Sequence, residues 1–145
     1  MLSLSPDRDI SGADGQLACP LGDPWSIRLA GASSACPAIE LYEASELVDV
    51  ISATTIARPL LRGARTATGG GGRRAIAWGR VPATGILPSV GFARRPWRGP
   101  WTPATVVLPM GWCWLAVADG GFTVALLRTA AGPVRRRLAA GAPCC

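Results

Sequence analysis

Any chemistry in this chain must come from carboxylates, thiols and guanidinium groups, because its 145 residues include no histidine and no lysine. The chain therefore has no Ser–His or Cys–His nucleophile pair and no imidazole general base. A Schiff-base lysine and a P-loop lysine are excluded as well. These absences argue against a self-contained hydrolase or kinase, and the sequence assigns no catalytic residue. The five cysteines lack CxxC spacing, so we expect no metal site.

A stripe of carboxylates is the first candidate group. It consists of Glu40, Glu43, Glu46 and Asp49, three residues apart. In PAIELYEASELVDVISATTIA (37–57), apolar residues fall on the other broad face of a helix. Pro37 suits a first helical turn and Pro59 would end the helix. We therefore expect an amphipathic helix over about 37–57. Its acids could serve acid–base chemistry or hold a metal, but we favour a solvated helix face.

A glycine-rich segment is the second candidate. Residues 62–74, RGARTATGGGGRR, place four consecutive glycines among arginines. Backbone N–H groups of such glycines can approach an anion closely. The segment has no GK[ST] ending, and no convincing strand leads into it. We therefore predict a flexible linker in preference to a phosphate loop.

Arginine and tryptophan are interspersed in residues 75–103. The side chains concerned are Trp78, Trp97, Trp101, Arg80, Arg94, Arg95 and Arg98. Such side chains together stack on bases and neutralise phosphates. Five prolines divide the segment into short extended pieces, and it has no RNP, KH or helix-turn-helix pattern. A nucleic-acid role is therefore open but unspecific.

Charge is divided unevenly along the chain. Residues 1–60 carry three arginines against eight acids, a net charge of −5, whereas residues 61–145 carry twelve arginines against Asp119 alone, a net charge of +11. The basic half could bind an anionic partner such as nucleic acid, anionic lipid or an acidic protein. Abundant Arg, Gly, Ala and Pro without Lys or Asn also indicate a GC-rich gene. In that case arginine is frequent because of its codons, and the arginine side chains are simply solvated.

The most ordered-looking stretch is GWCWLAVADGGFTVALLRT (111–129). Residues 104–127 are long enough to span a membrane. However, Asp119 near the middle of such a span would cost about 3 kcal/mol. The Asp-Gly-Gly turn between two β-rich runs instead predicts a β-hairpin at 112–129. We expect no membrane span.

Two short motifs resemble flavin-dependent monooxygenases and halogenase-like oxidoreductases. TATGGGGRRA (66–75) is similar to the stretch in which the chain returns to the flavin, and GWCWLAVADGGFTVALL (111–127) is similar to a substrate-domain strand pair. The resemblance covers about residues 64–137. The cofactor-binding residues that it implies are Thr68, Gly69 and Gly70, and the substrate-binding residues are Trp112 and Trp114.

The resemblance implies only part of such an enzyme. Residues 1–60 contain no GxGxxG fingerprint, and the late GD motif of the family is also missing. The chain would therefore be a truncated substrate-domain fragment that holds no cofactor alone, and FAD would bind only if a dinucleotide-binding half completed it. Such a fragment is expected to be inactive by itself.

The architecture that these patterns predict is α+β, with the helix over 37–57 packed on a small antiparallel sheet and extensive irregular loops rich in Gly and Pro. A short strand is expected around Trp25, Ile27 and Leu29. A further strand over 86–92 or a short helix from VRRRLAA (134–140) completes the domain. The predicted segments are a poorly ordered lead (1–36), the helix (37–61), the linker (62–74), a small β-rich domain (75–138) and a tail (139–145).

Three interpretations of function remain open on the sequence. The chain is a fragment of a flavin-dependent oxidoreductase, a small basic Arg/Trp module that binds an anionic partner, or a spurious or frameshifted reading frame. An odd number of cysteines and two early acids, Asp7 and Asp9, argue for a reducing compartment and against a signal peptide, so we expect a cytoplasmic location. Cys144 and Cys145 resemble a prenylated chain end, but nothing else resembles a small GTPase.

Overall fold

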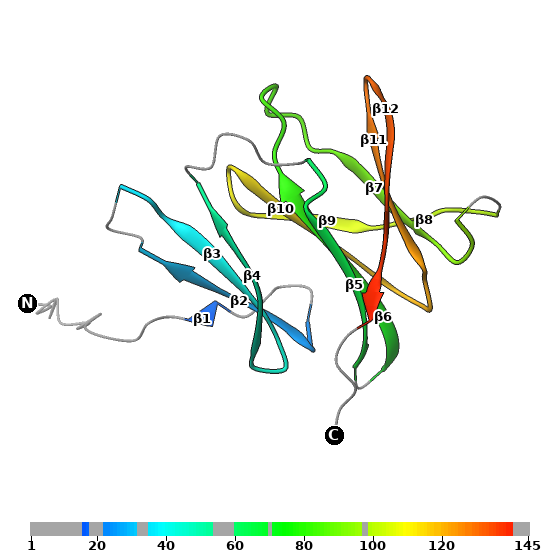
Figure 1. Ribbon diagram of the computed structural model, residues 1–145, viewed down its shortest axis with the longest axis horizontal. Helices are drawn as coiled ribbons and strands as arrows, with labels where there is room; N and C mark the ends of the chain where they lie inside the picture. Colours follow the sequence, from blue (N-terminus) through cyan, green and yellow to red (C-terminus); the bar gives the residue numbers. More distant parts are fainter. Residues whose placement is uncertain are drawn as a thin grey trace, which may run out of the picture.

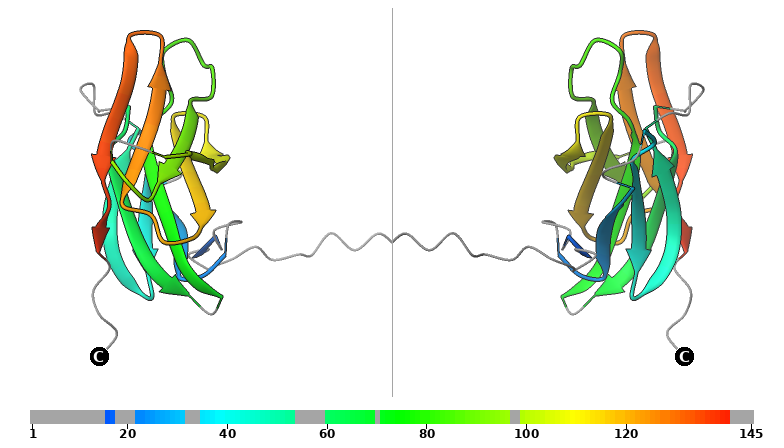
Figure 2. Two further views of the ribbon diagram at one scale, coloured as in Figure 1. Left: turned by 90° about the vertical axis from the view of Figure 1, so that its right-hand side faces the viewer. Right: turned by 90° about the vertical axis from the view of Figure 1, so that its left-hand side faces the viewer.

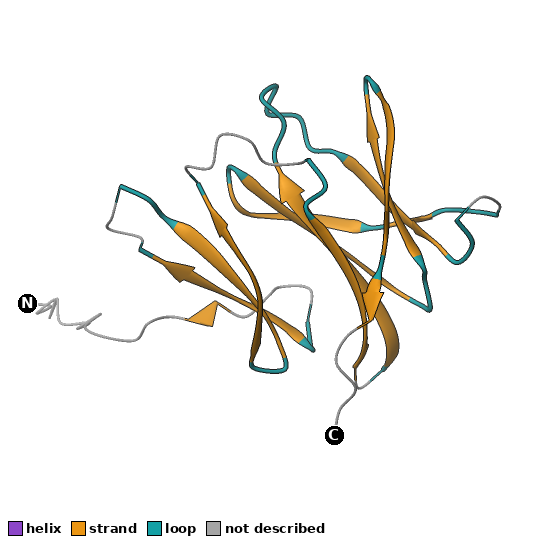
Figure 3. Cartoon of the chain, in the orientation of Figure 1, coloured by secondary structure: helices purple, strands orange, loops and turns teal. Residues whose placement is uncertain are grey.

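The computed structural model describes residues 16–17, 22–31, 35–53, 60–69, 71–96 and 99–140. Every regular element within these residues is a β-strand, and Figure 3 shows strands and loops but no helix. The predicted α+β class is therefore wrong, because the described part of the chain is all-β. In this part of the chain no helix is long and apolar enough to cross a membrane.

The strands form three sheets. In chain order they are β1 (Gln16–Leu17), β2 (Trp25–Ala30), β3 (Ala38–Glu43), β4 (Glu46–Ser52), β5 (Gly63–Gly69), β6 (Gly72–Arg80), β7 (Ser89–Ala93), β8 (Thr102–Pro103), β9 (Thr105–Met110), β10 (Cys113–Asp119), β11 (Val124–Thr129), β12 (Gly132–Arg137) and β13 (Ala139–Ala140). The first sheet has the order β1-β2-β3-β4, the central sheet β13-β5-β6-β10-β9 and the third sheet β12-β11-β7-β8. Paired strands are antiparallel except β13 and β5, which are parallel. In Figure 1 the central sheet lies between the other two.

The core has two layers because the central sheet is covered on both faces. Side chains alternate along a strand, so neighbouring residues of β6 and β10 point to opposite sides. Ile76 and Leu115 pack toward the first sheet, against residues such as Ile39. Ala77 and Trp114 pack toward the third sheet. This double burial leaves the strands in the middle of the central sheet with almost no exposed surface.

The predicted helix over 37–57 is instead the β3–β4 hairpin. Ile39 and Leu41 are both 0% exposed, and their spacing of two residues is the period of a strand rather than a helix. The chain turns at Ala44 and Ser45, whose φ angles of 46° and 75° are those of a tight hairpin turn. The burial of Ile39 and Leu41 between the first and central sheets therefore determines the structure of this segment, and the helical spacing of the acids does not. Residues 54–57 lie outside the described part.

The predicted hairpin at 112–129 is also wrong, although both of its runs are strands. β10 pairs with β6 and β9, whereas β11 pairs with β7 and β12. Gly120 to Thr123 therefore carry the chain from the central sheet to the third sheet. The reason is burial, since residues 113–117 and 124–127 are buried at every position. Strands buried on both faces need neighbouring layers, which an isolated hairpin cannot supply.

The predicted linker at 62–74 consists mainly of β5 and the start of β6, which form a regular antiparallel pair from Gly63↔Trp78 to Gly69↔Gly72. Gly69 and Gly72 pair at the tip of this hairpin, where Gly72 has a φ of 114°. The run VRRRLAA extends β12 into β13 rather than forming a helix, so Ala139 of the predicted tail pairs with Arg65. The expected strand around residues 25–29 is present as β2, and of the two alternatives the strand over 86–92 is present in part as β7, which begins at Ser89.

Candidate anion-binding surfaces

The residues that the flavin resemblance singles out do not come together in one site. Thr68 and Gly69 end β5 at the tip of the β5–β6 hairpin, and Gly70 lies outside the described residues. Trp112 is half-buried and packs against the core layer between the first and central sheets. Trp114 belongs to the other core layer. The two tryptophans therefore do not line one substrate pocket.

Trp114 has a structural role. Its side chain is 0% exposed, and its Nε1 donates hydrogen bonds to the carbonyl oxygens of Leu60 (3.1 Å) and Arg80 (2.9 Å). A buried indole normally needs such a partner for its N–H group. The Trp114 side chain thus belongs to the core, and its contact with a substrate stays a prediction.

The Arg/Trp segment over 75–103 is also divided by the fold. Trp78 is 4% exposed and belongs to the core beneath the first sheet. Trp101 is half-buried next to Gly91, where an added Cβ would lie 3.8 Å from the Trp101 Cβ. Trp97 and Arg98 lie outside the described residues. Of the tryptophans described in this segment, Trp101 is thus the better placed to reach solvent.

Asp49 on β4 is the centre of a polar network between the first and central sheets. Its carboxylate accepts two hydrogen bonds from Arg62, from Nε at 2.6 Å and from Nη2 at 2.9 Å. It also accepts one from Nε1 of Trp78 at 2.8 Å. Burial alone would raise the pKa of Asp49, but the hydrogen bonds from Arg62 and Trp78 and the Arg62 charge outweigh it and lower the pKa below its ordinary value.

Glu43 forms a second link between the same sheets. Its carboxylate accepts hydrogen bonds from Nε1 of Trp25 at 3.0 Å and from Nη2 of Arg65 at 3.4 Å. Glu40 accepts a hydrogen bond from the Tyr42 hydroxyl at 2.6 Å. The carboxylate stripe is therefore not a solvated helix face, since two of its members pair with arginines of the central sheet. Among the described residues, no group of three or more acids or cysteines could hold a metal ion.

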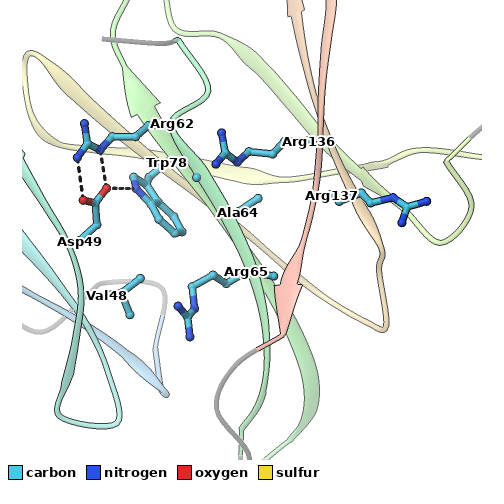
Figure 4. Close-up of a pocket in the computed structure, with 10 residues that line it drawn as sticks. Val48, Asp49, Arg62, Ala64, Arg65, Trp78, Arg136 and Arg137 are labelled. Atoms are coloured by element: carbon cyan, nitrogen blue, oxygen red, sulfur yellow. Dashed lines mark hydrogen bonds and ion pairs between the residues drawn. The ribbon is translucent and has the colours of Figure 1, made fainter.

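A cleft of about 530 Å³ opens where the three sheets meet. It is lined by Val48, Asp49, Arg62, Gly63, Ala64, Arg65, Trp78, Arg136, Arg137 and Ala139. Figure 4 shows the guanidinium groups of Arg62, Arg65 and Arg136 around the space next to Trp78. The Arg137 side chain points away from this space in the same view. Gly63 is needed at the cleft wall because a Cβ there would overlap the Trp78 ring.

Strand register decides where the arginines of the third sheet point. Ala125 and Leu127 on β11 are buried against the central sheet. Because side chains alternate along a strand, the exposed Arg128 lies on the opposite face. We call this face of the third sheet the outer face. In the left view of Figure 2 the third sheet is turned toward the viewer, with β12 at its edge.

The three arginines of β12 are divided between the two faces by the same rule. Directly opposed residues of an antiparallel pair point to the same side. Arg136 is opposite Ala125, so it faces the cleft, in agreement with Figure 4. Arg135 and Arg137 therefore lie on the outer face with Arg128, and all are exposed.

The outer face has no acid of its own. Residues 81–145 contain a single acid, Asp119 at the end of β10, and its carboxylate pairs with Arg74 of β6 at 2.7 Å. The uneven charge of the sequence is thus partly matched inside the molecule, where Arg62 and Arg65 meet the acids of the first sheet.

Sequence reasoning missed the pairing of Arg62 and Arg65 with the first sheet. The available signal was the opposite charge of the two halves of the chain, which predicts attraction between them as readily as a foreign partner. Comparison with protein-family models found no match, and neither curated proteins nor solved structures matched this chain.

Proposed function

We propose that this protein is a small binding module for single-stranded nucleic acid, and that the outer face of the third sheet holds the phosphate backbone. The observation that carries the proposal is the register that gathers the exposed side chains of Arg128, Arg135 and Arg137 on one face of the third sheet. Arg135 and Arg137 are two residues apart on one strand, so their Cα atoms are about 6.8 Å apart. Guanidinium groups repeated along a strand suit an extended chain of phosphates, each of which can accept a bidentate hydrogen bond.

An aromatic residue on the same face of the third sheet favours nucleic acid over an acidic protein. Gly91 pairs with Leu126, so a side chain at either position would point to the outer face. The Trp101 Cβ lies next to this point, 3.8 Å from the position of an added Gly91 Cβ. A half-buried tryptophan on the same face as exposed arginines can stack a base while the arginines neutralise the phosphates.

Replacing the three outer arginines together, in Arg128→Gln/Arg135→Gln/Arg137→Gln, is expected to lower the affinity for single-stranded DNA by at least about tenfold at low salt. The probe is a fluorescein-labelled oligodeoxythymidine of about 16 nucleotides, the upper site size known for one OB-fold. Fluorescence anisotropy over a series of KCl concentrations gives the salt dependence. For the wild type we expect a slope of about −2 in log K against log salt, and for the variant a slope near zero, because each neutralised phosphate contributes about −0.7.

Two neighbouring residues provide a matched control. Arg136 and Arg137 have the same charge and lie on the same exposed strand but point to opposite faces. Arg137→Gln should therefore weaken oligonucleotide binding, and Arg136→Gln should not. Equal losses in the two variants would contradict the assignment to the outer face. Equally tight binding of polyglutamate at the same salt concentration would make the partner an acidic protein instead.

The hypothesis of a truncated FAD-dependent oxidoreductase fragment rests on residues 66–75 and 111–127, and the burial of Trp114 counts against it. It predicts that the purified chain shows no flavin absorbance after incubation with FAD, because the chain has no GxGxxG fingerprint. It further predicts that flavin binding appears when the chain is co-expressed with a neighbouring frame that encodes this fingerprint. If the adjacent genomic sequence encodes no such half in any frame, the hypothesis should be abandoned.

A further inference from the structure

The cleft between the three sheets presents hydrogen-bond donors that the described protein leaves unused. Arg62 donates from Nε and Nη2 to Asp49 and from Nη2 to the Val50 carbonyl oxygen, which leaves Nη1 available. Nε of Arg65 is buried and has no hydrogen-bond partner. This Nε atom is itself inaccessible, but the Arg65 side chain is 24% exposed, so other atoms of it can meet a ligand in the cleft.

The acceptors at the cleft are already engaged. Both oxygens of Asp49 accept hydrogen bonds, from Arg62 and from Trp78. Among the other lining residues, Val48, Gly63, Ala64 and Ala139 have no polar side-chain group. A ligand that satisfies this cleft must therefore be rich in acceptors and need few donors.

The charge balance of the cleft is positive. Asp49 and Glu43 form ion pairs with Arg62 and Arg65, respectively. Arg136 takes part in none of the ion pairs found among the described residues. Its charge is therefore in excess, and the open cleft would attract an anion.

We propose that this cleft binds a phosphate group, which the guanidinium groups of Arg62, Arg65 and Arg136 contact from three sides. A carboxylate offers its acceptors in one plane, whereas a phosphate offers tetrahedral oxygens that can meet donors arriving from different directions. In Figure 4 the three guanidinium groups lie on different sides of the space next to Trp78. The volume of about 530 Å³ accommodates a phosphate ester as well as the free ion.

Isothermal titration calorimetry with the full chain tests the site, using inorganic phosphate in one series and adenosine monophosphate in another. We expect saturable binding with one site per chain. Binding of both ligands identifies the phosphate group as the recognised unit, and binding of inorganic phosphate alone identifies the free ion. Arg136→Gln should weaken binding about tenfold, because it removes one charge-assisted contact. No saturable heat with either ligand would overturn the proposal.

Two further variants keep the outcome interpretable. Arg128→Gln removes the same charge from the neighbouring strand β11 at an exposed position that does not line the cleft, so phosphate binding should persist. Arg65→Lys keeps the charge but replaces the planar guanidinium group by an ammonium group, and it should weaken binding as well. Equal affinity in Arg136→Gln and Arg128→Gln would show a general charge effect and contradict the site. Cleft and outer face lie on opposite sides of β12, so this proposal can fail while nucleic-acid binding is retained.

Discussion

Replacing Gly79 by alanine is expected to lower the free energy of unfolding by about 3 kcal/mol, because the new methyl group has no space. A Cβ at this position would overlap the carbonyl oxygen of Leu60 and lie 2.7 Å from its carbonyl carbon. It would also lie 2.9 Å from Cζ2 of Trp114. The same Leu60 oxygen accepts the hydrogen bond from the Trp114 indole, so moving it away breaks a buried contact as well.

Chemical denaturation followed by tryptophan fluorescence measures this loss. We expect one cooperative unfolding transition for the wild type. For Gly79→Ala we expect the same transition with its midpoint at a lower denaturant concentration. Gly111→Ala is the matched control, since nothing lies within 4 Å of a Cβ there, and its effect should stay within about 0.5 kcal/mol. Equal stability of the two variants would mean that Leu60 does not pass over Gly79. If the wild type shows no cooperative transition, the result would instead support the hypothesis that the chain is the product of a spurious or frameshifted reading frame.

Replacing Asp49 by asparagine is expected to lower the free energy of unfolding by about 2 kcal/mol at neutral pH. The substitution keeps the shape of the side chain but removes its negative charge. The carboxylate oxygens accept two hydrogen bonds from Arg62 and one from the Trp78 indole N–H, and an amide supports this set less well. The Asp49 side chain is only 19% exposed, so water replaces these bonds poorly. The first sheet would thereby lose its main polar link to β5 and β6.

The effect of Asp49 depends on pH with a definite sign. Its pKa in the folded protein lies below the ordinary value of 3.8 that the unfolded chain retains. The stabilisation is therefore complete above pH 3.8 and is lost as the pH falls through the lower, folded-state pKa. Denaturation midpoints of wild type and Asp49→Asn should differ fully at pH 5 to 7 and converge as the solution is acidified below about pH 4.

Asp119→Asn controls for the loss of a charged pair as such. Asp119 is bonded to Arg74 at 2.7 Å, similar to the Asp49–Arg62 distance, but its side chain is 83% exposed. Exposed ion pairs contribute little to stability, so this variant should resemble the wild type at every pH. A pH dependence that persists in Asp49→Asn would assign the acid sensitivity to another carboxylate.

Local sequence patterns predicted strands correctly where the strands are also buried in one of the two core layers. The strand expected near Trp25 is present as β2, and part of the strand considered over 86–92 is present as β7. The helix failed because the acids of 37–57 fit a helical period while Ile39 and Leu41 fit a strand period. Ile39 and Leu41 are buried against the central sheet, and this burial favours the strand period over the helical one. The residues of the central sheet are distant in the sequence.

The candidate sites were predictable only in their chemistry. The abundance of arginine after residue 60 and the lack of acids there indicate an anionic partner. The sequence does not say that Arg136 faces a cleft while Arg135 and Arg137 face outward, because this depends on the pairing of β12 with β11. Nor does it say that Arg62 and Arg65, in an expected linker, are neutralised by Asp49 and Glu43.

The sequence by itself determined which chemistry this protein can perform, because side-chain types do not depend on the fold. Without histidine or lysine it is limited to guanidinium, carboxylate and thiol chemistry, and its basic half predicts anion binding. Tertiary structure alone decided where that chemistry is placed. Asp119 and the two glycines after it connect two sheets rather than closing a hairpin, since β10 and β11 each need partners on both edges and cover on both faces. Long-range pairing of this kind depends on the whole chain, which short sequence windows cannot represent.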